Sequence, residues 1–123
     1  MSAIWESKKT VRSELRQEVE FTLYRMTFGR RLELMKKVRD LSARIEFFEA
    51  GREESNRMEA SLLGGEMDRL FLEWGLEEVR GLEIDGSPAT VAGLIDKGPE
   101  DLVHEVLGMV KAECGLNEAE RKN

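Results

Sequence analysis

The segment Thr10–Met26, TVRSELRQEVEFTLYRM, decides the fold, because its large apolar residues recur at even spacings. These residues are Val11, Leu15, Val19, Phe21 and Leu23. Such alternation is typical of strands that bury one face, whereas a helix repeats its apolar residues every three or four positions. The segment therefore predicts two half-buried strands, at about 9–16 and 18–26, that form a hairpin with its turn near Arg16–Glu18.

The apolar period becomes helical after Thr27, a residue type that caps helices. Over the range 28–50 the apolar stripe consists of Leu34, Val38, Leu41, Ile45 and Phe48. Over the range 53–74 it consists of Leu63, Met67, Leu70 and Trp74. Stripes of about two heptads are too short to argue for a free coiled coil. We therefore expect the two helices to pack antiparallel inside one domain.

Two features of the second helix need an explanation. Gly64 and Gly65 fall in its middle, where each glycine costs roughly 1 kcal/mol relative to alanine. Either the helix breaks there, or another backbone packs closely against it. Trp74 ends the stripe, and we expect it to be buried against Leu82 and Ile84.

Short elements follow Gly75. Leu82–Ile84 reads as a strand that ends in the turn Asp85–Pro88, and Thr90 is placed to cap a short helix through Ile95. Gly98 is expected to end that helix.

Pro99 is well placed at the first position of the next helix, which Gly115 ends. The apolar stripe of this helix consists of Leu102, Val103, Val106, Leu107 and Val110. Asn117 and Glu120 have the spacing of a capping box before a last charged turn.

These elements predict an α+β fold in one domain, residues 1–123. An N-terminal β-hairpin region (1–26) packs on a mainly helical bundle that contains the helical pair (27–75). A short third strand and the C-terminal helices follow (76–123).

Composition excludes several classes of protein. The 41% apolar and 36% charged residues indicate a folded soluble domain, and no apolar run is long enough for a membrane span. With one cysteine and one histidine, neither an internal disulfide nor a zinc site of the usual spacing is possible, so we expect a reduced intracellular protein. Residues 1–44 carry eleven Lys/Arg against six Asp/Glu, whereas residues 45–123 carry eight against nineteen. The net charge of −6 argues against a nucleic-acid or membrane partner.

The residues that could carry chemistry do not form a recognisable site. His104 and Glu105 begin like a zinc-protease helix, but Gly108 stands where the second ligand is required. Glu100 and His104 are expected to form a solvent-facing pair, and Cys114 to be a small core residue. We therefore expect no catalytic residues, no metal and no cofactor, and the protein is not expected to be an enzyme.

From Leu72 onward the chain carries a dense pattern of turn glycines and helix caps. The matching residues are LEWGL at 72–76, GLEIDGSPAT at 81–90, LI at 94–95, GPEDL at 98–102, Glu105, LNE at 116–118 and ERKN at 120–123. This pattern resembles a tail assembly chaperone-like family, small proteins encoded among the tail genes of long-tailed phages and prophages. The run GRRLEL at 29–34, after a strand hairpin, fits the same resemblance.

The resemblance implies a non-enzymatic chaperone in the host bacterial cytoplasm. Such a protein binds the long helical tape measure protein and assists assembly of tail tube protein around it. The resemblance does not identify particular binding residues, because the shared pattern consists of turn glycines and helix caps. Two other functions stay open: a small structural or tail-completion subunit of the virion, and a bacterial adaptor unrelated to phage. A homo-oligomer is compatible with each of them.

The first helix contains a phenylalanine that is out of place beside its stripe. Phe47 stands where the heptad pattern has twice placed a carboxylate, at Glu33 and Asp40. One interpretation is that the hairpin or a loop covers it. The other is that Phe47 anchors an amphipathic helix of the partner, beside Met35, Lys36 and Arg44.

Overall fold

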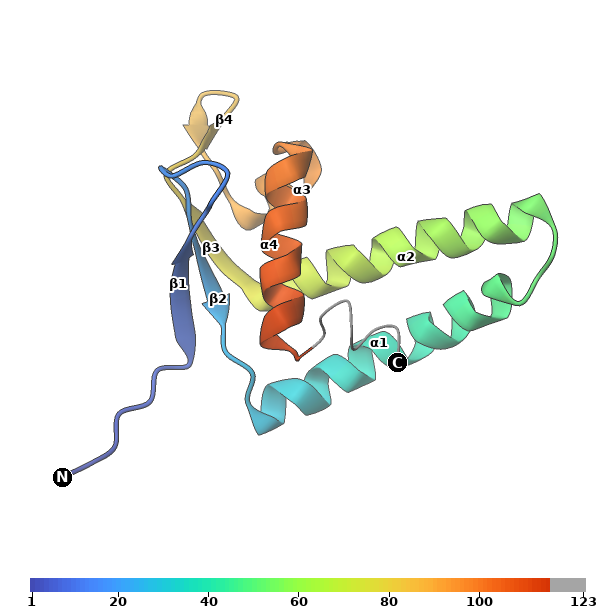
Figure 1. Cartoon of the computed structure of the whole chain (residues 1–123), viewed down its shortest axis with the longest axis horizontal. Helices are drawn as coiled ribbons and strands as arrows, with labels where there is room; N and C mark the ends of the chain where they lie inside the picture. The colour runs from blue at the N-terminus through green and yellow to red at the C-terminus, as the bar shows by residue number, and fades with distance from the viewer. Residues whose placement is uncertain (116–123) are drawn as a thin grey trace. The chain divides into compact units, whose positions relative to one another are not determined.

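The computed structural model describes residues 1–115 and shows an α+β fold (Figure 1). The capping box predicted at Asn117 and Glu120 lies outside the described residues. The strands are β1 (Lys8–Arg12), β2 (Glu20–Tyr24), β3 (Leu76–Arg80), β4 (Glu83–Ile84) and β5 (Ser87–Pro88). The helices are α1 (Phe28–Glu49), α2 (Glu54–Gly75), α3 (Val91–Lys97) and α4 (Glu100–Glu113).

The chain divides into two compact units. Unit 1 consists of residues 1–27 together with the chain from Phe71 onward, and unit 2 is the helical segment Phe28–Leu70. The first boundary coincides with the predicted change from strand to helix at Thr27. The second falls inside α2, whose last turn belongs to unit 1.

Unit 1 is built on an antiparallel sheet in the order β1–β2–β3. The predicted hairpin is confirmed: β1 pairs with β2 from Lys8 opposite Tyr24 to Arg12 opposite Glu20. Its strands are shorter than predicted, because the chain from Ser13 to Val19 forms the turn, closed by a bond from Ser13 N to Val19 O of 2.9 Å.

The alternation of residues separates the two faces of this sheet. Val19, Phe21 and Leu23 are buried on one face, while Thr10 and Thr22 pair on the other. The buried face is covered by α4, whose stripe is buried at Leu102, Val106, Leu107 and Val110. Gly75, at the end of α2, touches this layer so closely that a Cβ there would lie 2.5 Å from a methyl of Val110. The core of unit 1 therefore lies between the sheet and α4.

The strand β3 was not expected from the sequence. Its two buried residues, Leu76 and Val79, are three apart, which hides the period of a strand. They nevertheless face Leu23 and Phe21, which are two apart, because a bulge shifts the register between Thr22 and Leu23. A β-bulge supplies the one extra residue that this mismatch requires.

The segment after β3 contains the predicted strand, turn and helix cap, but Ser87–Pro88, predicted as part of the turn, form the strand β5. The turn between β4 and β5 has positive φ at Asp85 and Gly86, as a two-residue hairpin turn requires. Thr90 caps α3 by accepting a hydrogen bond from Gly93 N at 2.9 Å. Pro99 occupies the capping position of α4, one residue before the place that was predicted.

Unit 2 is a helical hairpin formed by α1 and residues 54–70 of α2. Helix α2 runs through Gly64 and Gly65 without a break, and no neighbouring atom lies within 4 Å of a Cβ built on either glycine. Both explanations offered for these glycines are therefore wrong within this structure. The predicted antiparallel helices do form, but they spread apart from the loop that joins them (Figure 1) and their Cα atoms stay more than 8 Å apart along almost their whole length.

The apolar stripes of unit 2 are incompletely covered. Leu34 and Leu63 are buried, but the remaining residues of the stripes are only half-buried: Val38, Leu41, Ile45, Phe48, Met67 and Leu70. The stripes thus identify the inner faces of the helices correctly, while the close packing expected between them is absent.

Candidate functional site

The four residues predicted to bind a partner all lie on α1 and are all exposed. Phe47 has 73% of its surface exposed and Met35 has 58%. Lys36 and Arg44 are exposed as well, and neither makes an ion pair in the part of the chain that the structure describes. No segment of unit 2 therefore covers Phe47.

Three of these residues share one face of α1. Lys36, Arg44 and Phe47 are separated by eight and three residues, and at about 100° per residue these spacings bring them to the outer face of the helix. We call these three residues the outer face. Two exposed acidic residues, Glu33 and Asp40, lie on the same side of the helix, and Asp40 lies 3.6 Å from Arg39.

Met35 does not belong to the outer face. It lies roughly 120° around the helix from Phe47 and about 18 Å away along the axis. The structure therefore brings Phe47 together with the two cations and places Met35 on another side of the helix.

The ring of Phe47 is held without being covered. It meets the half-buried ring of Phe48 edge to face, with ring centroids 5.2 Å apart and an interplanar angle of 85°. Such aromatic pairs contribute about 0.5–1.5 kcal/mol beyond the area they bury. Phe48 thereby orients Phe47 and leaves most of its surface to solvent.

Two further apolar residues of unit 2 are exposed on α2. Met58 and Leu62 have 67% and 59% of their surfaces exposed, and their helical phase places them on the same side of the hairpin as Phe47. Neither residue was predicted from the sequence to bind a partner. Their signal was available, since they are four residues apart and neither belongs to the spacing of Leu63, Met67 and Leu70.

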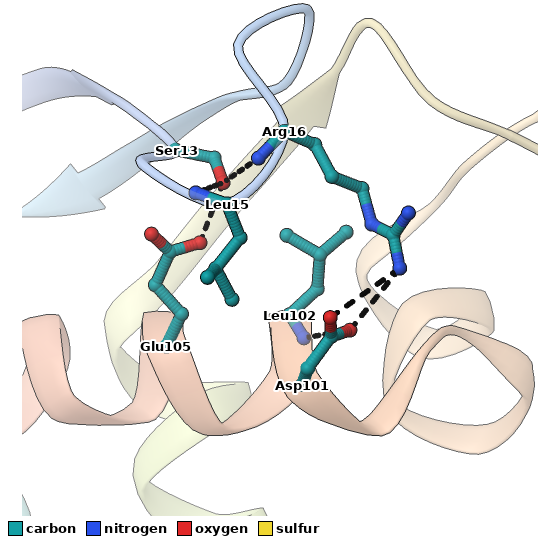
Figure 2. A network of polar contacts seen from close by, with 6 residues as sticks. All are labelled: Ser13, Leu15, Arg16, Asp101, Leu102 and Glu105. Carbon is teal, nitrogen blue, oxygen red and sulfur yellow. Dashed lines mark hydrogen bonds and ion pairs between the residues drawn. The ribbon is translucent and has the colours of Figure 1, made fainter.

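A second candidate is the polar network between the β1–β2 turn and α4 (Figure 2). The Ser13 hydroxyl, which is buried, donates to Glu105 Oε1 at 2.6 Å and accepts from the backbone N–H groups of Leu15 and Arg16. Glu105 Oε2 accepts from Glu14 N at 2.7 Å. One carboxylate thus fixes the turn twice.

A second contact supports the same turn. The Arg16 guanidinium donates to both oxygens of Asp101, at 3.2 and 3.4 Å. The side-chain oxygens of Ser13, Glu105 and Asp101 all form hydrogen bonds within the fold, so the arrangement acts as a clamp between the turn and α4. The sequence offered one signal for it: Ser13 stands on the buried parity of the first strand, where a hydroxyl needs a partner.

Two ion pairs attach β1 to other elements of unit 1. Lys9 Nζ lies 2.6 Å from Glu113 Oε2, and this hydrogen bond lowers the pKa of the Glu113 carboxyl, although partial burial acts in the opposite direction. The Lys8 ammonium lies 2.7 Å from Glu77, and its hydrogen bond to that carboxylate raises the pKa of Lys8. These pairs give the edge strand β1 fixed partners.

The residues examined for catalytic chemistry lie where the sequence placed them. His104 and Glu100 form an exposed pair 3.7 Å apart, and Cys114 is a buried free thiol. Residues 1–115 contain no group of three or more His, Cys, Asp or Glu side chains arranged to hold a metal ion. No helix among these residues combines the length and the apolar character needed to span a membrane.

Comparison with known proteins adds nothing to the resemblance noted in the sequence. Neither the protein-family models, nor the curated proteins, nor the solved structures give a significant match.

Proposed function

We propose that this protein is a non-enzymatic tail assembly chaperone of a phage or prophage, which binds the tape measure protein and assists tail tube assembly in the host bacterial cytoplasm. The observation that supports binding is the exposure of Phe47, an aromatic ring outside the stripe of α1 with 73% of its surface open. The resemblance of the segment from Leu72 onward to tail assembly chaperones supplies the identity of the partner.

The outer face favours a particular kind of ligand. An aromatic ring beside two unpaired cations suits an amphipathic helix that offers an apolar groove for the ring and carboxylates for Lys36 and Arg44. A tape measure protein, as the resemblance describes it, is a long helical chain that supplies many such helices. Buried aromatic anchors often contribute about 2 kcal/mol or more to binding.

The role of each residue follows from its position. Phe47 contributes apolar area at the centre of the contact, and Arg44, one turn away on the same face, fixes the direction of an acidic helix. Lys36 lies about 16 Å further along the axis from Phe47, so it extends the contact over three turns. Met35 is outside this contact.

The test is co-expression of the chain with the tape measure protein encoded beside it, followed by affinity capture and sedimentation. Phe47→Ser is expected to reduce capture about tenfold or more while the melting temperature changes little, because an exposed ring contributes little to the fold. Phe28→Ser is the matched control. Phe28 is a second exposed phenylalanine on the same helix but lies away from the outer face, and its removal should leave capture unchanged.

Three results would contradict the proposal. Capture that survives Phe47→Ser would remove the anchor, and a large fall in melting temperature would mean that Phe47 supports the fold. Recovery of the protein in finished virions would favour the structural subunit over the chaperone.

A further inference from the structure

Helix α1 carries a short row of exposed apolar residues away from its stripe. The row consists of Phe28, Leu32 and Met35, which have 83%, 45% and 58% of their surfaces exposed. Their spacings of four and three residues place all three within about 60° of one another around the helix. No segment of unit 2 covers these side chains. We call them the α1 row.

Helix α2 carries a row with the same spacing. Met58 and Leu62 are 67% and 59% exposed, and Gly65 follows Leu62 by three residues on the same face. No neighbouring atom lies within 4 Å of a Cβ built on Gly65, so the row ends in an open notch. Glycine is unfavourable inside a helix, and a large side chain of another molecule entering this notch would account for it. We call these three residues the α2 row.

The two rows face opposite sides of the hairpin. Met35 follows the stripe residue Leu34 by one position, whereas Leu62 comes one position before the stripe residue Leu63. Because the helices are right-handed and antiparallel, residues just before the stripe lie on one side of the hairpin and residues just after it lie on the other. One molecule can therefore offer its α1 row to a neighbour on one side and its α2 row to a neighbour on the other.

The two rows match when they come together antiparallel from two copies of the chain. In one register every member of the α1 row comes level with a member of the α2 row to within one residue: Leu32 with Leu62, Met35 with Met58, and Phe28 with Gly65. The largest side chain of the α1 row thus meets the notch of the α2 row. Facing large and small residues in this way lets two packed helices interlock.

The charged residues at one end of the rows fit the same register. Arg39, one turn beyond Met35, comes level with Glu54, one turn before Met58. In the described chain Arg39 has only its neighbour Asp40, at 3.6 Å and with both side chains largely exposed, and Glu54 makes no ion pair there. The contact ends at this pair, because α1 residues after Arg39 pass the start of α2 in the neighbouring copy.

The other end of the contact is complementary as well. In the same register Glu66 comes level with the first turn of α1. That turn contains no acidic residue, and the N-terminus of a helix carries a partial positive charge that favours a carboxylate. One register therefore matches the apolar rows, the notch and the charges at both ends, and this agreement identifies the occupant as a second copy of the chain.

We propose that the chain associates head to tail, with the α1 row of one copy packed antiparallel against the α2 row of the next. Such a contact leaves one row free at each end, so the association is open-ended. The α1 row spans about 10 Å along the helix, and the contact is therefore smaller than the ~800 Å² that each partner contributes to a standard interface. We expect an affinity in the micromolar range. The contact omits the outer face, so it does not depend on the proposed function.

The test blocks one row at a time. Phe28→Ser removes the largest side chain of the α1 row, and Leu62→Ser removes the centre of the α2 row. Both side chains are exposed, so both variants should fold, and circular dichroism with the melting temperature checks this. Sedimentation equilibrium of the full chain, from about 1 µM to about 1 mM, gives the masses and the dissociation constants.

The expected result has two parts. The natural chain should pass from its monomer mass of 14.1 kDa at low concentration to masses above twice that value at high concentration, and each variant alone should associate about tenfold or more weakly. An equimolar mixture of the two variants should regain an affinity close to the natural one, because Phe28→Ser keeps an intact α2 row and Leu62→Ser keeps an intact α1 row. The mixture should stop at a dimer, since the two remaining rows are blocked.

Two neighbouring glycines give a matched pair of variants. Gly65→Gln fills the notch and should weaken association about tenfold or more. Gly64→Gln places the same side chain about 100° around the helix, away from the α2 row, and should leave association unchanged. Both glycines have open surroundings, so both variants should fold and gain helix propensity.

Several outcomes would overturn the proposal. One is a natural chain that stays monomeric up to about 1 mM. Another is a mixture of Phe28→Ser and Leu62→Ser that associates no better than the separate variants, since a two-fold contact would behave in that way. Equal effects of Gly64→Gln and Gly65→Gln would place the contact elsewhere.

Discussion

Units 1 and 2 differ in how completely they bury their apolar side chains. In unit 1, Phe21, Leu94, Leu102 and Val106 are completely buried between the sheet and its helices. In unit 2 most of the stripe residues remain half-exposed, although the stripes are equally regular in sequence. A sheet covered by a helix closes a core by itself, whereas two helices that spread apart cannot enclose the space between them.

The comparison also separates structure from function. Unit 1 uses its polar residues internally, as the Ser13–Glu105 clamp and the Lys9–Glu113 pair show. In unit 2, Lys36 and Arg44 form no ion pair with any residue of the range 1–115, and the ring of Phe47 is exposed. We therefore expect the stability of the chain to depend chiefly on unit 1, and we propose that a partner binds unit 2.

The largest effect on the free energy of unfolding is expected when one leucine in each unit is replaced by alanine. Leu102→Ala removes a fully buried side chain and should lower the free energy of unfolding by about 2–5 kcal/mol. Leu41→Ala removes a half-buried one, and at concentrations where the chain is monomeric it should cost only about 1 kcal/mol. Urea denaturation followed by circular dichroism measures both values.

Equal losses for Leu102→Ala and Leu41→Ala would break the comparison between the units. That result would mean that the stripe of unit 2 is packed as tightly in solution as the core of unit 1. A loss at Leu41 that grows with protein concentration would instead agree with a stripe covered by a second chain.

The next effect concerns the clamp. Glu105→Ala removes the acceptor of both the Ser13 hydroxyl and Glu14 N, and we expect a loss of about 2–3 kcal/mol, because hydrogen bonds to a charged group contribute about 1.5–3 kcal/mol each and are not additive. The measurement is the urea midpoint of the variant. Lys36→Ala, on the outer face, is the control and should change the midpoint little. If the two variants unfold at the same midpoint, the clamp does not stabilise the turn.

The sequence predicts the fold well where one residue pattern has one physical meaning. The switch of period at Thr27 placed both the hairpin and α1, and Thr90 capped α3 as expected. β3 was missed because Leu76 and Val79 are three residues apart, and only the bulge in the sheet, a feature of pairing between distant segments, makes both of them face the core.

The sequence likewise predicts some features of the candidate site and misses others. The position of Phe47 outside the stripe placed it on the outer side of the helix but left open whether another segment covers it, and only the structure shows the ring exposed. The clamp was not found, because Ser13 and Glu105 are 92 residues apart and neither identifies its partner. The open hairpin could not be foreseen either: a stripe shows which face of a helix is apolar, but not which molecule covers it.

Substitution of two glycines of α2 by alanine should have smaller effects on stability, and the two effects should have opposite signs. Gly65→Ala should raise the free energy of unfolding by about 0.5–1 kcal/mol, since its Cβ enters open space and alanine favours the helix. Gly75→Ala should be destabilising by about 1–3 kcal/mol, because its Cβ meets a methyl of Val110 at 2.5 Å. Thermal unfolding of the two variants should shift in opposite directions, and a shift of both in the same direction would contradict the contrast between an open and a filled environment.

The smallest effect concerns pH and the Lys9–Glu113 pair. The ion pair lowers the pKa of Glu113 in the folded protein below its ordinary value of 4.5, so the unfolded chain takes up a proton first as the pH falls. The stabilisation is therefore complete above about pH 4.5 and is lost as the pH falls through the lower pKa of the folded state. Because Lys9 is about one-third exposed, the pair contributes less than about 1 kcal/mol.

Glu113→Gln should lower the free energy of unfolding by this amount at pH 6, and the difference from the natural protein should shrink toward zero as the pH approaches 3. A difference that stays constant over this range would show that the variant acts through packing and that the charge of Glu113 does not stabilise unit 1.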